Sequence, residues 1–233
     1  MTKIVIGIVA AAAVLVAGFF AVYKIWIESD PEPRAEIAET PVTESREGAA
    51  ESELDGTYTV VPGPADTPTF VGYRVTEQFA AAVIEQETTG RTSDVTGTFT
   101  INGNTVSEVT MTANLLTLTS DREMRDNRIK TLGLESELFP EATFVLTEPI
   151  ELPAEPEVGE TVAATAVGDF TLHGVTNRVE IPVEGRWDGT TIQVVGNLPV
   201  VFADYDMETP NVAGFVTVRD EGEMEFQIFF QQT

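Results

Sequence analysis

The sequence contains no cysteine, only one histidine and few basic residues. Without cysteine the chain has no disulfide bond, thiol nucleophile, thiolate metal ligand or lipidated cysteine. Lys and Arg number 13 against 38 Asp and Glu, which gives a formal net charge of −25. Binding to nucleic acid, or docking on an anionic lipid surface, needs basic side chains spread over a face. We therefore expect no nucleic-acid partner.

Catalytic and metal-binding signatures are also missing. The lone histidine, His173, falls on the face opposite the apolar residues before it, so we expect it to point outward beside the Gly174 turn, without the partners of a catalytic or zinc site. Asp204, Asp206 and Glu208 alternate, but the glycine and later glutamate of an EF-hand loop are absent. No G-x-S-x-G, phosphate-loop or dinucleotide pattern occurs. We expect neither a metal site nor an enzyme.

The first 27 residues are strongly apolar. The 20 residues from Ile4 to Tyr23 carry no charge and, as a helix rising ~1.5 Å per residue, would span a hydrocarbon core of roughly 30 Å. Tyr23, Lys24 and Trp26 are residues found at membrane interfaces. A cleaved signal segment is the alternative, but its apolar region is usually about 7–15 residues long and precedes an A-x-A site. We predict a single-pass transmembrane anchor over 1–27, with the following domain on the extracytoplasmic side of the cell membrane.

Residues 28–56 differ in composition, being rich in Glu, Pro, Ala, Ser and Thr and lacking apolar periodicity. Such a composition cannot bury enough surface to fold. We predict an acidic disordered linker with an r.m.s. span of about 30 Å. It would hold the remaining domain, residues 57–233, near the membrane.

From residue 57 onward apolar residues recur with period two. Every second residue from 224 to 230 is apolar, and similar alternation occurs over 109–115, 179–183 and 192–202. Strands with one apolar face are typical of antiparallel sheets. Turn signals such as Asn102-Gly103-Asn104 and Trp187-Asp188-Gly189 separate the segments. About eight strands in such a domain favour an all-β fold, either a closed barrel or a sandwich.

The stretch "SDREMRDNRIK", residues 120–130, interrupts this period. Ser120 and Glu123 form an S-x-x-E capping box and Gly133 is a natural stop, which predicts a short helix inserted in the β domain. A solvated helix face, paired with nearby acidic residues, is the ordinary reading of its charges. The stretch carries four of the chain's cations: Arg122, Arg125, Arg128 and Lys130.

Four motifs follow one another along the domain: "MRDNRI" with Arg125-Asp126, "ELFPEATF", "GDFTLHGVTNRVEIPV" and "FADYDM" before a closing amphipathic strand. In their order and spacing, residues 54–233 resemble the YceI-like domain family. The resemblance implies an extended, lipocalin-like antiparallel barrel of about eight strands. It also implies that the interior binds polyisoprenoid or other long amphiphilic lipids.

The interior of such a barrel either is packed with side chains or holds one ligand, and alternation alone leaves both open. Small residues beside large aromatic ones on the inner faces would leave a tube. With the resemblance, we expect a cavity that holds an isoprenoid lipid or quinone. The residues expected to contact this ligand are Val71, Tyr73, Val75, Phe99, Ile101, Met111, Phe144, Leu146, Phe170, Phe226 and Ile228.

The helix at 120–133 would close one end of the barrel, through Arg122, Arg125 and Asp126. A guanidinium suits a phosphate or carbonyl of a ligand head group, because its donors form a planar fork. The competing interpretation is an ion pair that pins the helix to the barrel. We favour this structural role, because adjacent helical residues point apart and each then needs its own partner.

The resulting hypothesis is a membrane-tethered, extracytoplasmic protein that sequesters or carries a long-chain isoprenoid, either a quinone or a polyprenyl lipid. Its partners would be that lipid and, through the N-terminal helix, the membrane. Burial would suffice for binding, without covalent chemistry or a cofactor. The alternative is a surface-anchored protein-interaction module with a filled core. A hollow interior would favour the first hypothesis.

Overall fold

The computed structural model describes residues 29–38, 54–79, 84–212 and 216–233. Its strands are β1 (Gly56–Val61), β2 (Phe70–Phe79), β3 (Ile84–Thr92), β4 (Val95–Asn102), β5 (Thr105–Asn114), β6 (Thr119–Ser120), β7 (Glu141–Leu146), β8 (Ile150–Glu151), β9 (Thr161–Leu172), β10 (Val175–Trp187), β11 (Thr191–Val201), β12 (Asn211–Val212) and β13 (Val216–Gln232). Its helical elements are η2 (Leu115–Thr117), α2 (Glu123–Arg128), η3 (Ile129–Gly133) and η4 (Phe202–Tyr205).

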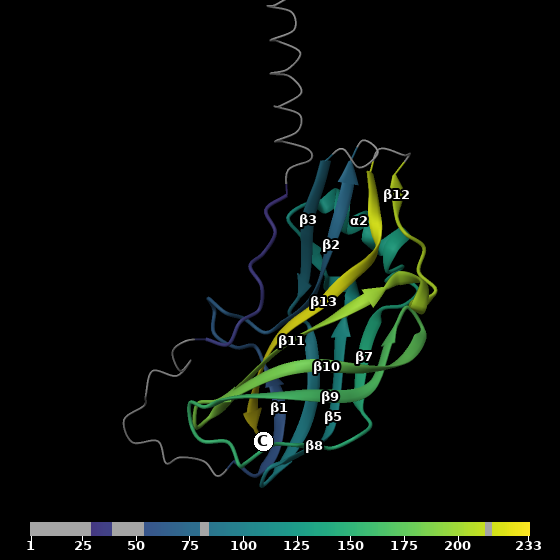
Figure 1. Ribbon diagram of the computed structural model, residues 1–233. Coiled ribbons are helices and arrows are strands. Elements are labelled where there is room, and N and C mark those ends of the chain that lie inside the picture. Colours follow the sequence, from purple (N-terminus) through teal and green to yellow (C-terminus); the bar gives the residue numbers. More distant parts are fainter. Residues whose placement is uncertain (1–28, 39–53, 80–83, 213–215) are drawn as a thin grey trace, which may run out of the picture. The chain divides into compact units, whose positions relative to one another are not determined.

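Eight antiparallel strands close into a barrel (Figure 1). Around the ring the order is β1-β4-β5-β7-β9-β10-β11-β13, and β13 closes it by pairing with β1. β13 is 17 residues long, so its N-terminal part extends past β1 and pairs with β2. The sheet continues from β2 through β3 to β6. The predicted all-β antiparallel barrel with a short inserted helix is confirmed.

The turn signals of the sequence mark two of the hairpins. Gly103, between β4 and β5, and Gly189, between β10 and β11, have φ angles of 60° and 97°. Glycine adopts this region without the steric cost that a Cβ atom imposes. Asp188 fixes the second turn, because its Oδ1 accepts hydrogen bonds from the backbone N–H groups of Thr190 (2.9 Å) and Thr191 (2.7 Å).

The inserted helix starts later than its capping box predicts. α2 begins at Glu123 with Arg122 at the N-cap position, and no side chain caps it. The prediction that Ser120 caps the helix is wrong: its hydroxyl instead donates to Asp126 Oδ1 (2.6 Å) and accepts from the Arg122 N–H (3.2 Å). The hydroxyl proton thus goes to a charged carboxylate, which is a strong acceptor, and its lone pair goes to an N–H one residue before the helix begins. The π-helical turn η3 then ends at Gly133, where the sequence predicts the stop.

Residues 31–38, here termed the strap, lie against the outside of the barrel, although they fall within the predicted disordered linker (28–56). The Glu32 N–H donates to Thr89 Oγ1 (2.9 Å). Gln193 accepts from the Ala38 N–H and donates to the Glu36 carbonyl, both at 3.0 Å. Composition gave no sign of this, because the main chain of the strap makes these bonds. The predicted linker from 39 to 53 lies outside the described residues.

Charged side chains lie buried between the strap and the barrel. Arg74 and Glu225, which are 5% and 2% exposed, meet with Nη2 and Oε2 3.1 Å apart. Arg91 Nη2 lies 2.9 Å from the other oxygen of Glu225, and Arg74 Nη1 lies 2.6 Å from Glu87. Arg74 also donates to the Glu32 carbonyl of the strap (2.8 Å). Several partners for each charge offset the cost of removing these groups from water.

The barrel begins slightly before the predicted boundary at residue 57. Leu54 is buried, and its carbonyl accepts a hydrogen bond from the Tyr58 hydroxyl (2.8 Å). No helix within the described residues has the length and hydropathy to cross a membrane. The predicted anchor, residues 1–27, lies outside those residues.

Candidate functional site

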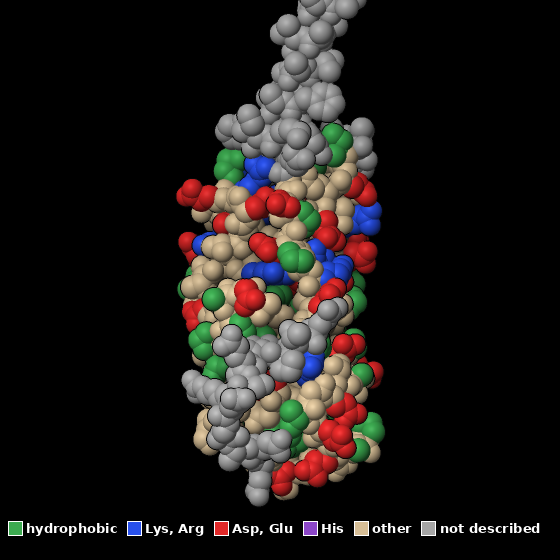
Figure 2. Space-filling view, turned by 90° about the vertical axis from the view of Figure 1, so that its left-hand side faces the viewer, with side chains coloured by type: hydrophobic (Ala, Val, Ile, Leu, Met, Phe, Trp, Pro, Cys, Tyr) green, Lys and Arg blue, Asp and Glu red, His purple; other side chains and the backbone are tan. Residues whose placement is uncertain are grey.

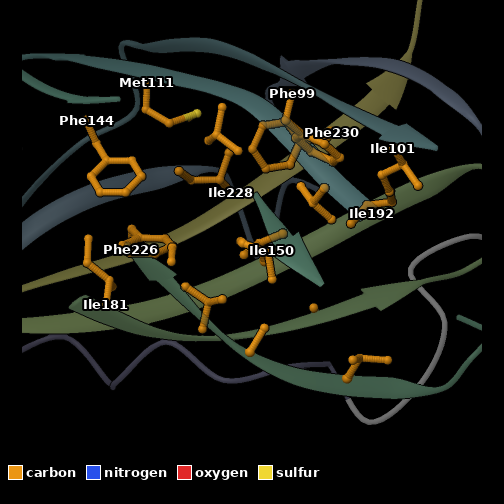
Figure 3. Close-up of a pocket in the computed structure, with 18 of the residues that line it drawn as sticks. Phe99, Ile101, Met111, Phe144, Ile150, Ile181, Ile192, Phe226, Ile228 and Phe230 are labelled. Atoms are coloured by element: carbon orange, nitrogen blue, oxygen red, sulfur yellow. The ribbon is translucent and has the colours of Figure 1, made fainter. Parts of the chain in front are cut away.

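A cavity of about 200 Å³ lies inside the barrel and is lined mainly by apolar side chains (Figure 3). The walls are the inward faces of β4, β5, β7, β9, β10, β11 and β13. The volume is below the roughly 300–1,000 Å³ of typical ligand pockets, so the interior is narrow. The residues labelled around it in Figure 3 are Phe99, Ile101, Met111, Phe144, Ile150, Ile181, Ile192, Phe226, Ile228 and Phe230.

Glycines on neighbouring strands let large side chains lie flat against the wall. Phe226 is paired with Gly196, where a Cβ atom would come within 2.6 Å of the ring. Met111 is likewise paired with Gly97, where a Cβ atom would come within 2.4 Å of its sulfur. A Cβ atom in place of either glycine would displace the large side chain. Because protein interiors are densely packed, the side chain could move only into the cavity. The glycines therefore help to keep the cavity open.

Short side chains on β9 and an irregularity in β5 also shape the cavity. On β9, Ala164 and Ala166 line the cavity, and short side chains there leave room that larger ones would fill. On β5, Val106 and Val109 both line it although they are three residues apart. A shift of register opposite Phe99 explains this, because an extra residue in one strand re-aims the side chains beyond it.

The residues predicted to contact a ligand divide into two groups. Tyr73 and Leu146 pack against a core cluster and are not among the residues that line the cavity. Val75 is not among them either, and it lies beside Gly222, where a Cβ atom would be 2.8 Å from Val75 Cγ1. The residues that do line the cavity are Val71, Phe99, Ile101, Met111, Phe144, Phe170, Phe226 and Ile228.

Sequence reasoning missed part of the lining. The period-two alternation recognised over 179–183 continues to Trp187, so extending it would have identified the inward residues of this strand. Leu152, Pro156 and Glu160 were not foreseeable in this way, because they belong to the connection between β8 and β9. The missed lining residues include Ala142, Ile150, Leu152, Pro156, Glu160, Val162, Ile181, Val183, Ile192 and Trp187.

Arg125 ties α2 to β2 through buried ionic contacts. Its Nε donates to Glu77 Oε1 (2.8 Å), its Nη2 donates to Glu77 Oε2 (3.3 Å), and its Nη1 pairs with Asp121. Burial lowers the pKa of Arg125, but the hydrogen bonds and charge of Glu77 and the charge of Asp121 raise it further, so the net direction is upward. Burial also raises the pKa of the nearby Tyr73 hydroxyl above its ordinary value. The guanidinium and the phenol therefore keep their protons across the physiological range.

The neighbours of Arg125 have partners of their own. Asp126 accepts hydrogen bonds from the backbone N–H (2.8 Å) and hydroxyl (2.6 Å) of Ser120. Arg122 Nε lies 3.7 Å from Asp121 Oδ2. Arg125 and Asp126 thus have separate partners, and the pinning role favoured from the sequence stays a prediction.

The prediction that His173 points outward is wrong. The side chain is 8% exposed, with Nδ1 3.1 Å from the Tyr205 carbonyl oxygen and Nε2 2.9 Å from Glu135 Oε2. The Phe139 ring packs on it with centroids 4.2 Å apart. His173 has a φ of 52°, and this left-handed turn departs from strand alternation and directs the ring inward. His173 therefore joins the segment after η3 to η4.

Acidic side chains are spread over the face shown in Figure 2. Among the described residues, no three His, Asp or Glu side chains gather as a group that could hold a metal ion. The cavity offers chiefly apolar burial.

Comparison with known proteins agrees with this architecture. Residues 65–230 match the family described as the YceI-like domain. A polyisoprenoid binding domain from Saccharophagus degradans, implicated in plant cell wall breakdown, is 17% identical, with 76% of this chain and 98% of that one covered and a TM-score of 0.58. BcnA of Burkholderia cenocepacia is 19% identical, with 67% and 95% covered and a TM-score of 0.49. No protein of curated function matches the sequence.

Proposed function

The chain belongs to the family of YceI-like domains, and on this basis we propose that its barrel binds the hydrocarbon chain of an isoprenoid lipid, either a quinone or a polyprenyl lipid. The apolar cavity inside the barrel is the observation that carries the proposal. The polyisoprenoid binding by the Saccharophagus degradans domain supports the same ligand class. The apolar cavity inside the barrel favours this proposal over the alternative, a protein-interaction module with a filled core.

Burial of apolar surface would be the main source of free energy for such binding. If a ligand buries about 500 Å² of apolar surface, the gross stabilisation is roughly 12 kcal/mol before the entropy of association is subtracted. Large side chains of the wall, such as Phe144 and Phe226, would lie along the bound chain. A narrow interior favours a single extended chain over a fused-ring lipid. Binding of this kind sequesters or carries the lipid and needs no nucleophile or general base.

We further propose that the protein is tethered to the cell membrane by residues 1–27, with the barrel on the extracytoplasmic side. The uncharged run from Ile4 to Tyr23 supports this, because its length matches a hydrocarbon core of about 30 Å. A tether would keep the barrel near the bilayer that supplies its ligand. Protease added outside an intact cytoplasmic membrane should digest the barrel, and full protection would contradict the proposed orientation.

Recovery of the bound lipid tests the proposed function. The full chain is purified gently from its native membrane, extracted with organic solvent, and both extract and intact protein are analysed by mass spectrometry. We expect about one long-chain isoprenoid lipid per chain. An empty barrel that also takes up neither added quinone nor added polyprenol would sink the proposal.

A further inference from the structure

One buried polar group in the cavity wall is unused. Trp187 lines the cavity and is 8% exposed, and its indole Nε1 has no hydrogen-bond partner among the described residues. A buried tryptophan N–H usually finds a partner, because leaving a donor unpaired away from water is costly. Such a group within a cavity wall points to an acceptor that a ligand brings.

The adjacent Arg186 also lines the cavity and has a buried Nε without a partner among the described residues. Successive strand residues face opposite sides of the sheet, so its side chain leaves the cavity toward the outer face. Its Nη1 donates to the carbonyl of Ala38 in the strap, outside the barrel. Trp187, in register with Ile192 of β11, stays on the inner face.

The position of Trp187 fits the polar end of a ligand. The cavity there is also lined by Leu152, Pro156 and Glu160 of the β8–β9 connection, and Glu160 is exposed to solvent. The helix α2, pinned by Arg125, belongs to another part of the barrel, joined to β2. A ligand chain can therefore extend among the apolar side chains of the barrel while its head lies at Trp187, beside the β8–β9 connection.

We propose that Trp187 Nε1–H donates a hydrogen bond to a neutral oxygen at the head of the bound isoprenoid. The inference rests on the proposed function and adds the class of head group. Because the indole nitrogen is a donor only, the partner must be an acceptor such as a quinone carbonyl or a prenol hydroxyl. The Glu160 carboxylate and the net charge of −25 disfavour an anionic phosphate head. A pure hydrocarbon would leave the indole N–H unpaired.

The test compares ligands with and without the oxygen. The full chain, delipidated and kept in solution by an amphipathic polymer, is titrated with decylubiquinone, phytol and the hydrocarbon phytane. Trp187→Phe should weaken binding of the two oxygen-bearing probes about 5- to 10-fold, as expected for one hydrogen bond, and leave phytane within about twofold. An equal effect on phytol and phytane, or no effect on any probe, overturns the inference while the proposed function stands.

A second measurement leaves Trp187 unchanged. The chain has two tryptophans, so Trp26→Phe makes Trp187 the single indole. Its ¹⁵N–¹H indole resonance should move downfield with phytol or decylubiquinone and stay in place with phytane. An unchanged resonance with a bound oxygen-bearing probe overturns the hydrogen bond. Failure of the wild type to bind all three probes overturns the proposed function and this inference with it.

Discussion

At the scale of single residues, all three nitrogens of the Arg125 guanidinium contact carboxylates. Nε and Nη2 bond to Glu77, and Nη1 pairs with Asp121. Arg125 and Glu77 are each 8% exposed, so removal of the cation would leave a carboxylate buried without compensation. Breaking one side of a buried pair costs far more than the pair contributes as a whole.

We therefore expect Arg125→Ala to lower the free energy of unfolding by about 3–5 kcal/mol, measured by denaturant titration of the unliganded protein. Arg128→Ala, on the same helix, is the matched control and should change it by less than about 0.5 kcal/mol. A double variant with Glu77→Ala should lose less than the sum of the two single variants, because the partners are coupled. If Arg125→Ala instead abolished ligand binding at unchanged stability, the residue would be a head-group contact.

Single residues also show how far the sequence predicts the site. Strand alternation places Phe226 and Ile228 on the inner face, where they line the cavity. The same alternation cannot say how far along the barrel a residue lies. Tyr73 and Leu146 therefore share the apolar pattern but pack in the core instead of lining the cavity. His173 departs from alternation altogether because its backbone is left-handed.

At the scale of elements, the strap is the segment that composition describes least well. Its composition is that of a disordered linker, yet its backbone forms hydrogen bonds with side chains on the outside of the barrel. Gln193 is the clearest case, since its amide serves both the Ala38 N–H and the Glu36 carbonyl and also reaches Gln227 Oε1 at 3.1 Å. The two contacts with the strap join residues 155 and 157 positions apart, which no local pattern reports.

Gln193→Ala should release the strap, because it removes three hydrogen bonds from a buried side chain. We expect a loss of about 1–3 kcal/mol in unfolding free energy and faster hydrogen exchange at the amides of Glu32 to Ala38. Gln231→Ala, at an exposed position of β13, is the control and should leave both quantities unchanged. Unaltered exchange in Gln193→Ala would show that this amide does not hold the strap.

At the scale of the whole molecule, charge and apolarity are separated. Acidic residues are spread over the face in Figure 2, while the cavity inside the barrel is lined mainly by apolar side chains, with Glu160 as an acidic exception. A net charge of −25 favours solubility and discourages binding of anionic surfaces. This arrangement supports the proposed selection of a neutral, long-chain ligand, to which the proposed hydrogen bond from Trp187 would add.

The central claim is that the lipid chain occupies the interior of the barrel. Ala164 and Thr165 are neighbours on β9, with Ala164 in the cavity wall and Thr165 exposed outside. The most direct measurement is the lipid bound per chain, by native mass spectrometry of the full-length wild type, Ala164→Phe and Thr165→Phe. We predict that Phe at 164 fills the cavity and reduces bound lipid at least tenfold, while Phe at 165 leaves it at the wild-type level. Equal lipid content in both variants would contradict the claim and place the ligand elsewhere.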